Sequence, residues 1–170
     1  MITKIKLTFL AVALFLMTFA QDNNDLTSKI VAGDNMPTFI AQTLSGKTIN
    51  TDELQGRPVL LIFFATWCEP CVKELPHIEE LRQQYRNDEL AILCVGREHS
   101  LTDLEQFNKK YNFTFDIAAD PDRKIYALFA EKDIPRNYVI GKNGKVVYKS
   151  VGFSKEKFSA MKIKIEELIK

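Results

Sequence analysis

The stretch that decides the fold reads PVLLIFFATWCEPC and runs from Pro58 to Cys71. Its apolar part, residues 58–65, is typical of a strand that is buried on both faces of a sheet. The residues that follow the cysteines have the spacing of an amphipathic helix. The sequence therefore predicts a buried strand, a sharp turn and a helix whose first turn carries Cys68 and Cys71.

Two cysteines at this spacing can form a reversible disulfide. Residues three apart in a helical turn have Cα atoms about 5 Å apart, within the range of about 4.4–6.8 Å that a disulfide requires. At a helix start, unpaired N–H groups and the helix dipole favour the thiolate of Cys68 over its thiol. The alternatives are an inert pair or a zinc site, which needs a second pair of ligands. The remaining candidate ligands, Cys94, His77 and His99, do not repeat the motif. We therefore expect a redox-active pair and no bound metal.

The first 20 residues have the pattern of a secretory signal peptide. Lys4 and Lys6 precede an apolar stretch at residues 7–20, and polar residues follow it. Such a basic start, apolar core and small-residue end predict cleavage after Ala20. An uncleaved membrane anchor is the alternative, although the apolar stretch is shorter than the ~20 residues that a membrane span requires.

The remaining chain of about 150 residues is long enough for one domain with its own core. We expect residues 21–32 to be a flexible lead-in and residues 33–170 to be a single domain. Without Lys4 and Lys6 the formal net charge changes from +1 to about −1. This balance gives no reason to expect nucleic acid or a membrane surface as a partner. Outside the cytoplasm, an exposed dithiol tends to oxidise unless it is reduced again.

Strand patterns recur along the domain. A hairpin is expected within residues 38–50, and the apolar residues 90–95 predict a second buried strand. Later in the chain, Asn143-Gly144 predicts the turn of a hairpin formed by residues 137–151.

Helix patterns alternate with these strands. Residues 101–111 have an apolar stripe after Ser100, a suitable N-cap. Asp120-Pro121 predicts a short helix. Its expected inward residues are Ile125, Leu128 and Phe129. The last helix is expected after Ser154. Strands that alternate with helices predict an α/β fold, with a mixed sheet and helices on both of its faces.

These features resemble the exported TlpA/ResA-like thiol–disulfide oxidoreductases of bacteria, within the thioredoxin superfamily. The likeness covers nearly all of residues 33–170. The segments that carry it are the hairpin ahead of Gly56-Arg57-Pro58, the stretch from Phe63 to Cys71, Glu74-Leu75-Pro76, Asp120-Pro121-Asp122 and Ile134-Pro135. The resemblance implies a thioredoxin-like domain of the AhpC/TSA type, with a central mixed sheet flanked by helices and an N-terminal β-hairpin extension.

The resemblance also implies how the site works. Cys68 would attack a partner disulfide, and Cys71 would resolve the mixed disulfide that results. Pro135 matches the family's cis-proline, which places the backbone of Ile134 beside an incoming peptide. A trans proline at a strand start is the alternative. Trp67 is expected to be an apolar wall for docking partners, or else a structural residue.

Glu74 places a carboxylate on the apolar face of the predicted helix, between the directions of Ile78 and Leu81. It either reaches sideways to water or a lysine, or is buried with a raised pKa. A buried carboxyl here would suit proton transfer to or from Cys71. ResA-like proteins carry a glutamate at this point, whereas cytoplasmic thioredoxin has a buried aspartate at the position of Ile62. We expect Glu74 to be catalytic.

The function implied is that of a periplasmic or otherwise extracytoplasmic enzyme that needs no cofactor and reduces protein disulfides. Its partners would be disulfide-bearing exported proteins, such as apocytochrome c, and a membrane thiol reductant of the DsbD/CcdA type. The direction of electron flow stays open. One departure from the family is Arg136, where a small hydroxyl residue is common, and this arginine is expected to place a cation near the substrate groove.

Two other functions use the same fold. Peroxiredoxins place a threonine three residues before the peroxidatic cysteine, where this chain has Ala65. Copper-binding modules commonly use two cysteines one position further apart and a distant histidine. Peroxide consumption and copper titration discriminate these alternatives. Cys94 is expected to be a small core residue, and His77 and His99 are expected at the surface.

Overall fold

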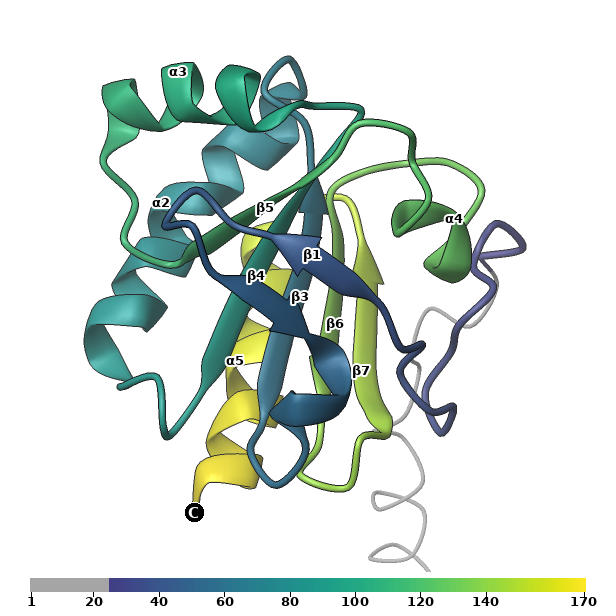
Figure 1. The fold of residues 1–170 in the computed structure, drawn as a ribbon. Helices are drawn as coiled ribbons and strands as arrows, with labels where there is room; N and C mark the ends of the chain where they lie inside the picture. Colours follow the sequence, from purple (N-terminus) through teal and green to yellow (C-terminus); the bar gives the residue numbers. More distant parts are fainter. Residues whose placement is uncertain (1–24) are drawn as a thin grey trace, which may run out of the picture.

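A five-stranded mixed sheet forms the centre of the molecule in the computed structural model, which describes residues 25–170 (Figure 1). Its strands are β3 (Val59–Phe64), β4 (Ala91–Arg97), β5 (Asp116–Asp120), β6 (Arg136–Ile140) and β7 (Val146–Val151), in the order β5-β4-β3-β6-β7. The strand predicted at residues 58–65 is therefore the central one. It pairs in parallel with β4 and antiparallel with β6.

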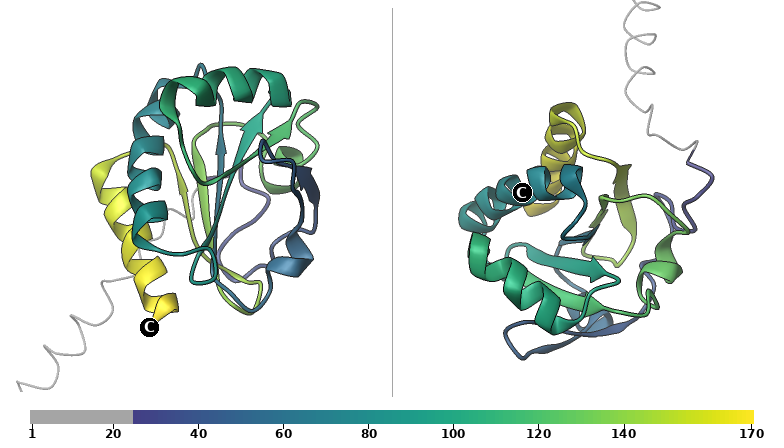
Figure 2. Two further views of the ribbon diagram at one scale, coloured as in Figure 1. Left: turned by 60° about the vertical axis from the view of Figure 1, so that its left-hand side comes forward. Right: turned by 90° about the horizontal axis from the view of Figure 1, so that it is seen from above.

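Helices cover both faces of this sheet (Figures 1 and 2). The remaining elements are the hairpin strands β1 (Ile40–Gln42) and β2 (Thr48–Asn50), the 3-10 helix η1 (Thr51–Leu54), and the helices α2 (Glu69–Gln84), α3 (Leu101–Tyr111), α4 (Tyr126–Phe129) and α5 (Lys155–Ile169). Side chains of α2, α3 and α5 pack into one apolar cluster, whereas those of β1, η1 and α4 pack into the other. The predicted α/β fold with an N-terminal hairpin is confirmed.

The alternation of side chains along β3 connects the two clusters. Residues 60, 62 and 64 lie in the cluster beneath α2 and α5, and residues 59, 61 and 63 lie in the cluster beneath α4 and the hairpin. The accessible surface of each of these six residues is at most 2%. A strand that is buried on both faces has no polar alternation, which explains the continuous apolar run in the sequence.

The region before α4 differs from the prediction. Asp120 is the last residue of β5, a strand that the sequence analysis did not predict, and the helix begins only at Tyr126. The carboxylate of Asp120 accepts hydrogen bonds from the backbone N–H groups of Ile125 and Tyr126, at 3.0 and 2.8 Å. Leu128, which was expected inward, is 42% exposed, and Tyr126 is buried instead. A helix of one turn is too short to show a repeated apolar stripe. The spacing of its apolar residues therefore did not identify which side chains face the core.

The expected signal peptide, residues 1–20, and residues 21–24 lie outside the described part of the chain. None of the helices in residues 25–170 combines the length and the apolar character that a membrane span requires. The rest of the expected lead-in, residues 25–32, packs on the domain and does not extend freely from it. The backbone N–H of Lys29 donates to the carbonyl of Phe129, and that of Glu131 donates to the carbonyl of Thr27, both at 2.9 Å.

A buried ion cluster holds this segment in place. Oδ2 of Asp25 lies 2.7 Å from Nη1 of Arg136 and 3.6 Å from Nζ of Lys149. Both cations are buried. Burial of the Asp25 carboxylate opposes its ionisation, but hydrogen bonds from Thr27, Arg136 and Ser28 outweigh this effect and hold its pKa well below the usual range. The cluster therefore joins the N-terminal segment to β6 and β7.

We expect Asp25→Asn to lower the free energy of unfolding by about 3 kcal/mol, because it leaves two buried cations without a counterion. Urea unfolding followed by circular dichroism measures the change. The control is Asp122→Asn, because the carboxylate of Asp122 pairs with Lys124 on the exposed surface; its effect should stay within about 0.5 kcal/mol. Equal effects of the two substitutions would contradict the role given to Asp25.

Candidate active site

Cys68 and Cys71 form a disulfide at the start of α2, with their Cα atoms 5.2 Å apart. Cys68 is the N-cap residue, and its Sγ accepts a hydrogen bond from the backbone N–H of Cys71 at 3.3 Å. Pro70 lies in the first helical turn, where its missing N–H breaks no helical hydrogen bond. The Cys68 sulfur thus lies where the first amide groups and the helix dipole favour negative charge.

The loop before β6 lies opposite the sulfurs. The peptide bond between Ile134 and Pro135 is cis, as the resemblance implied. The carbonyl oxygen of Ile134 is 3.8 Å from Sγ of Cys68, and both residues line the same cavity. The backbone of Ile134 is therefore close enough to contact a chain that is bonded to Cys68.

A cavity of about 610 Å³ opens beside Cys68 and extends between the Trp67 ring and the loop at residues 131–134. We call this cavity the groove. The Trp67 side chain is 63% exposed although it is large and apolar. This exposure favours the docking-wall interpretation of Trp67 over the structural one, since a structural tryptophan would be expected in the core.

Glu74 is buried, so the second of its two predicted placements is the observed one. It is 2% exposed, and its Oε1 accepts a hydrogen bond from Nδ2 of Asn137 at 2.7 Å. Its Oε2 has no hydrogen-bond partner among the described residues. Burial raises the pKa of Glu74 to about 8, although the hydrogen bond from Asn137 acts in the opposite direction. The carboxyl can therefore gain or lose a proton near neutral pH.

Asn137 is a site residue that the sequence analysis missed, because it was placed only in a hairpin strand. It lies opposite Ile62 in the pairing of β6 with β3. Its Oδ1, like Oε2 of Glu74, is buried without a partner in the described chain. If the Glu74 carboxyl carries a proton, its O–H group supplies the hydrogen-bond donor that these two oxygens otherwise lack. The available signal was a polar residue in the middle of a strand beside the central one.

His99 was expected at the surface, and this prediction is wrong. The residue is 8% exposed, and its Nε2 accepts a hydrogen bond from the backbone N–H of Thr66 at 3.0 Å. Burial lowers the pKa of His99, which favours the neutral ring that can accept this bond. His99 thus positions the turn that leads from β3 into Trp67 and Cys68.

Arg136 was expected to place a cation near the groove, and this prediction is also wrong. Its side chain is fully buried. Its Nε donates to the carbonyl oxygens of Lys132 and Asp133, both at 3.0 Å, and its Nη2 donates to Lys132 at 2.7 Å. A buried guanidinium needs many acceptors, and these carbonyls, together with Asp25, provide them. Arg136 therefore supports the loop at residues 131–135 from the side of the core.

Two further expectations concern the other cysteine and metal ions. Cys94 is a free, buried residue of the apolar cluster beneath α2, which confirms the prediction of a core position. Across residues 25–170, no three His, Cys, Asp or Glu residues form a group that could hold a metal ion.

Comparisons with known proteins agree with this geometry. Residues 32–149 match the model of the AhpC/TSA family. The thiol-disulfide oxidoreductase ResA of a Bacillus cereus strain is 34% identical over 124 residues, which are 73% of this chain and 72% of that protein.

Two solved structures are also similar. A candidate protein disulfide isomerase from Bacteroides thetaiotaomicron has a TM-score of 0.79 and 29% identity, over 84% of this chain and 92% of that one. The exposed lipoprotein thioredoxin of Streptococcus pneumoniae strain TIGR4 has a TM-score of 0.67 and 26% identity, over 78% of this chain and all of that one.

The raised pKa of Glu74 predicts a pH dependence of stability. Between the ordinary pKa of 4.5 and the folded value of about 8, the folded protein holds a proton that the unfolded chain releases. Stability therefore decreases as pH rises through this window. Glu74→Gln should abolish the decrease, so its unfolding free energy relative to the unsubstituted protein should increase by on the order of 3 kcal/mol between pH 5 and pH 9.

Urea unfolding of the oxidised proteins at both pH values measures this difference. The control is Glu53→Gln, since Glu53 is exposed on η1; its difference from the unsubstituted protein should not change with pH. A difference for Glu74→Gln that is constant from pH 5 to pH 9 would show that the Glu74 carboxyl is ionised in the fold at its ordinary pKa.

Proposed function

The chain belongs to the AhpC/TSA family and is a thiol–disulfide oxidoreductase with a thioredoxin fold, and we propose that it reduces the disulfides of exported proteins outside the cytoplasm. The observation that carries this proposal is the Cys68–Cys71 disulfide at a helix start, with the Ile134 carbonyl and the groove beside it. A disulfide placed in this way can be reached by a polypeptide, and its S–S bond can be reduced again by thiol–disulfide exchange.

Exchange proceeds through a mixed disulfide. In the reduced protein, the thiolate of Cys68 attacks one sulfur of the client's disulfide, whose S–S bond breaks as the other sulfur leaves. Cys71 then attacks Sγ of Cys68, and the second client sulfur leaves as a thiolate. Two electrons pass to the client, and the Cys68–Cys71 disulfide forms. Cys68 takes the first role because it is the N-cap residue and lines the groove, whereas Cys71 is fully buried.

Glu74 takes part in the second step. Cys71 must lose its proton to attack, and its complete burial favours a neighbouring side chain over bulk solvent as the acceptor. Glu74 follows Cys71 by three positions on α2, and both side chains lie in the interior. A carboxyl with a pKa of about 8 is well matched to a thiol as a proton acceptor near neutral pH. We assign Glu74 the role of general base toward Cys71.

The client's chain docks beside the sulfurs. Trp67 offers an exposed apolar surface on one side of Cys68, and the backbone of Ile134 lies on the other. Pro135 follows directly and starts the turn into β6. A polypeptide between these walls would hold its cysteine sulfur in line with Cys68, which is the geometry that exchange requires.

Residues 1–20 carry the pattern of an export signal, and the similar S. pneumoniae protein is described as exposed. A protein in this location needs a supply of electrons to stay reduced. We therefore infer a membrane thiol reductant of the DsbD/CcdA type as the donor. The acceptors are exported proteins with disulfides, and apocytochrome c is a candidate client. The peroxidase alternative has no support at Ala65, which lies where a peroxiredoxin carries threonine.

The two cysteines should behave differently when substituted. Cys68→Ser should lower the rate of insulin disulfide reduction to the background of dithiothreitol alone, because the attacking sulfur is absent. Cys71→Ser should accumulate a mixed disulfide with the client, seen by mass spectrometry without reductant. Cys94→Ala is the control and should keep its activity, since Cys94 lies in the core. Trapping by Cys68→Ser in place of Cys71→Ser would reverse the assigned order.

The reduction potential of the Cys68–Cys71 pair tests the direction of electron flow. Equilibration with glutathione or dithiothreitol redox buffers gives the value. A reductant should have a potential near about −250 mV or lower, whereas a value near about −120 mV would identify an oxidant that forms disulfides in its clients.

A further inference from the structure

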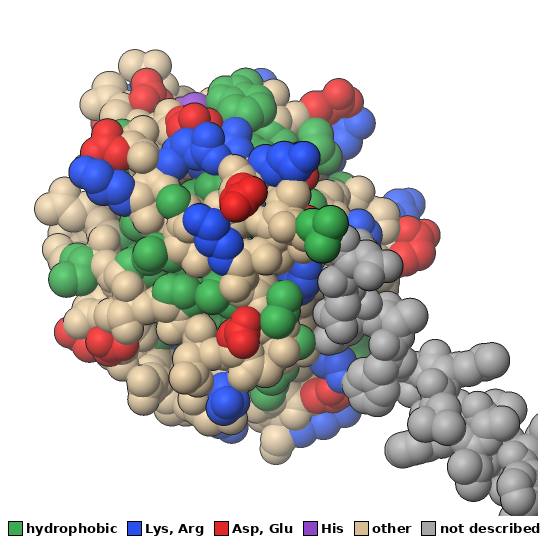
Figure 3. Space-filling model, turned by 90° about the vertical axis from the view of Figure 1, so that its right-hand side faces the viewer, with side chains coloured by type: hydrophobic (Ala, Val, Ile, Leu, Met, Phe, Trp, Pro, Cys, Tyr) green, Lys and Arg blue, Asp and Glu red, His purple; other side chains and the backbone are tan. Residues whose placement is uncertain are grey.

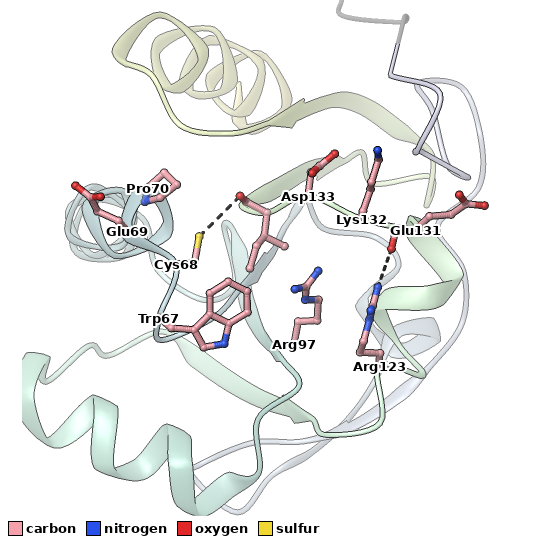
Figure 4. A pocket seen from close by; sticks show the side chains of 10 residues that line it. Trp67, Cys68, Glu69, Pro70, Arg97, Arg123, Glu131, Lys132 and Asp133 are labelled. Carbon is pink, nitrogen blue, oxygen red and sulfur yellow. Dashed lines mark hydrogen bonds between the residues drawn. The ribbon is translucent and has the colours of Figure 1, made fainter.

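Two arginines lie on the floor of the groove. Arg97 is the last residue of β4, and Arg123 lies in the turn before α4. Both line the same cavity as Cys68, and their guanidinium groups lie between Trp67 and the loop at residues 131–134 (Figure 4). The side chain of Arg97 lines the groove and is 11% exposed, so its charge is little screened by solvent.

Aromatic rings hold these cations in place. The guanidinium carbon of Arg97 is 5.5 Å from the centre of the Trp67 ring and 5.2 Å from that of Tyr126. Arg123 lies 5.4 Å from Tyr126, and its Nη2 donates to the carbonyl of Glu131 at 2.7 Å. Stacked guanidinium groups are already ordered, so they lose little conformational entropy when they bind an anion.

The floor of the groove has more positive than negative charge. Glu98 is the one acidic residue paired with the two arginines in the described chain, at 3.1 Å from Arg97 and 3.7 Å from Arg123. Nε of Arg97 is buried and has no hydrogen-bond partner among residues 25–170. Two cations thus share one acidic partner there, which leaves an excess of one positive charge.

The other charged residues around the groove do not neutralise this floor. Glu69 pairs with Lys73 at 2.7 Å on the exposed side of α2. The side chains of Glu131, Lys132 and Asp133 point away from the two arginines (Figure 4). On the face seen in Figure 3, Lys and Arg side chains are mixed with Asp and Glu. The excess of positive charge is thus a local property of the groove floor.

We propose that Arg97 and Arg123 bind the carboxylate of an aspartate or glutamate that lies close to the reacting cysteine of the client. This inference rests on the proposed disulfide exchange, because it concerns the polypeptide that is held at Cys68. The fork of a guanidinium matches a carboxylate, and its charge-assisted hydrogen bonds are stronger than neutral ones. Clients with an acidic residue near the cysteine are therefore reduced faster than clients with a neutral one.

Matched peptides test this preference. Each is a disulfide-linked dimer with acetylated and amidated ends, and the pair differs only in Glu or Gln two residues from the cysteine. Trp67 is the only tryptophan of the chain, so its fluorescence follows the oxidation of Cys68 in a stopped-flow experiment. The unsubstituted protein should reduce the Glu peptide about tenfold faster, as expected for a charge-assisted hydrogen bond that is partly open to solvent. The ratio should decrease as salt concentration rises.

Substitutions locate the effect. Arg97→Gln and Arg123→Gln should each lower the Glu-to-Gln rate ratio toward one, and Arg97→Lys should retain part of it. Lys109→Gln is the control, because Lys109 is an exposed cation on α3, and it should keep the full ratio. The readout is a ratio within each variant, so a general loss of activity does not imitate the effect. If Arg97→Gln fails to fold, Arg123→Gln decides, since the Arg123 side chain is 37% exposed.

The outcomes separate two failures. Reduction of both peptides at equal rates by the unsubstituted protein would overturn the carboxylate site and leave the proposed function intact. A ratio that persists in both arginine variants would also overturn it. Reduction of neither peptide would contradict the proposed function itself.

Discussion

The hydrogen bond from the Cys71 N–H to the Cys68 sulfur is the interaction on which the site depends, because it makes a sulfur the N-cap of α2. Helix N-caps usually carry oxygen acceptors such as serine or aspartate. A sulfur in this place receives both the free amide groups and the positive end of the helix dipole. The position of this sulfur is set by β3, which is buried on both faces and ends just before the Ala65-Thr66 turn. The helix α2 therefore begins at the edge of the sheet, where the groove lies.

Three buried polar side chains hold the segments around this sulfur. Glu74 binds Asn137 beneath α2, His99 accepts from the turn at Thr66, and Arg136 donates to the carbonyls of the loop at residues 131–135. Buried polar groups are costly unless they are hydrogen-bonded, so each of them needs its particular partner. Arg136 also binds Asp25, so the packing of the N-terminal segment and the shape of the active-site loop depend on the same guanidinium.

The features that the sequence predicted well are local ones. The apolar run of β3, the N-cap at Ser100, the Asn-Gly turn and the cysteine spacing each lie within a few residues, and each led to the observed element. The missed features join distant residues. Glu74 and Asn137 are 63 positions apart, and Asp25 and Arg136 are 111 apart. His99 was predicted at the surface and Arg136 near the groove because no local pattern indicates their burial. The Thr66 partner of His99 and the Asp25 partner of Arg136 both come from distant segments. The one-turn helix α4 is too short for a periodic signal.

Ionisation of Cys68 in the reduced protein provides the most direct test of the central claim. The rate of its alkylation by iodoacetamide, followed as a function of pH by mass spectrometry of the Cys68 peptide, reports the thiolate of Cys68, which lines the groove, whereas Cys71 and Cys94 are fully buried. We expect the midpoint of this profile to lie clearly below the value of about 8.5 for a free cysteine. A midpoint at or above that value would contradict the claim that the start of α2 activates this sulfur.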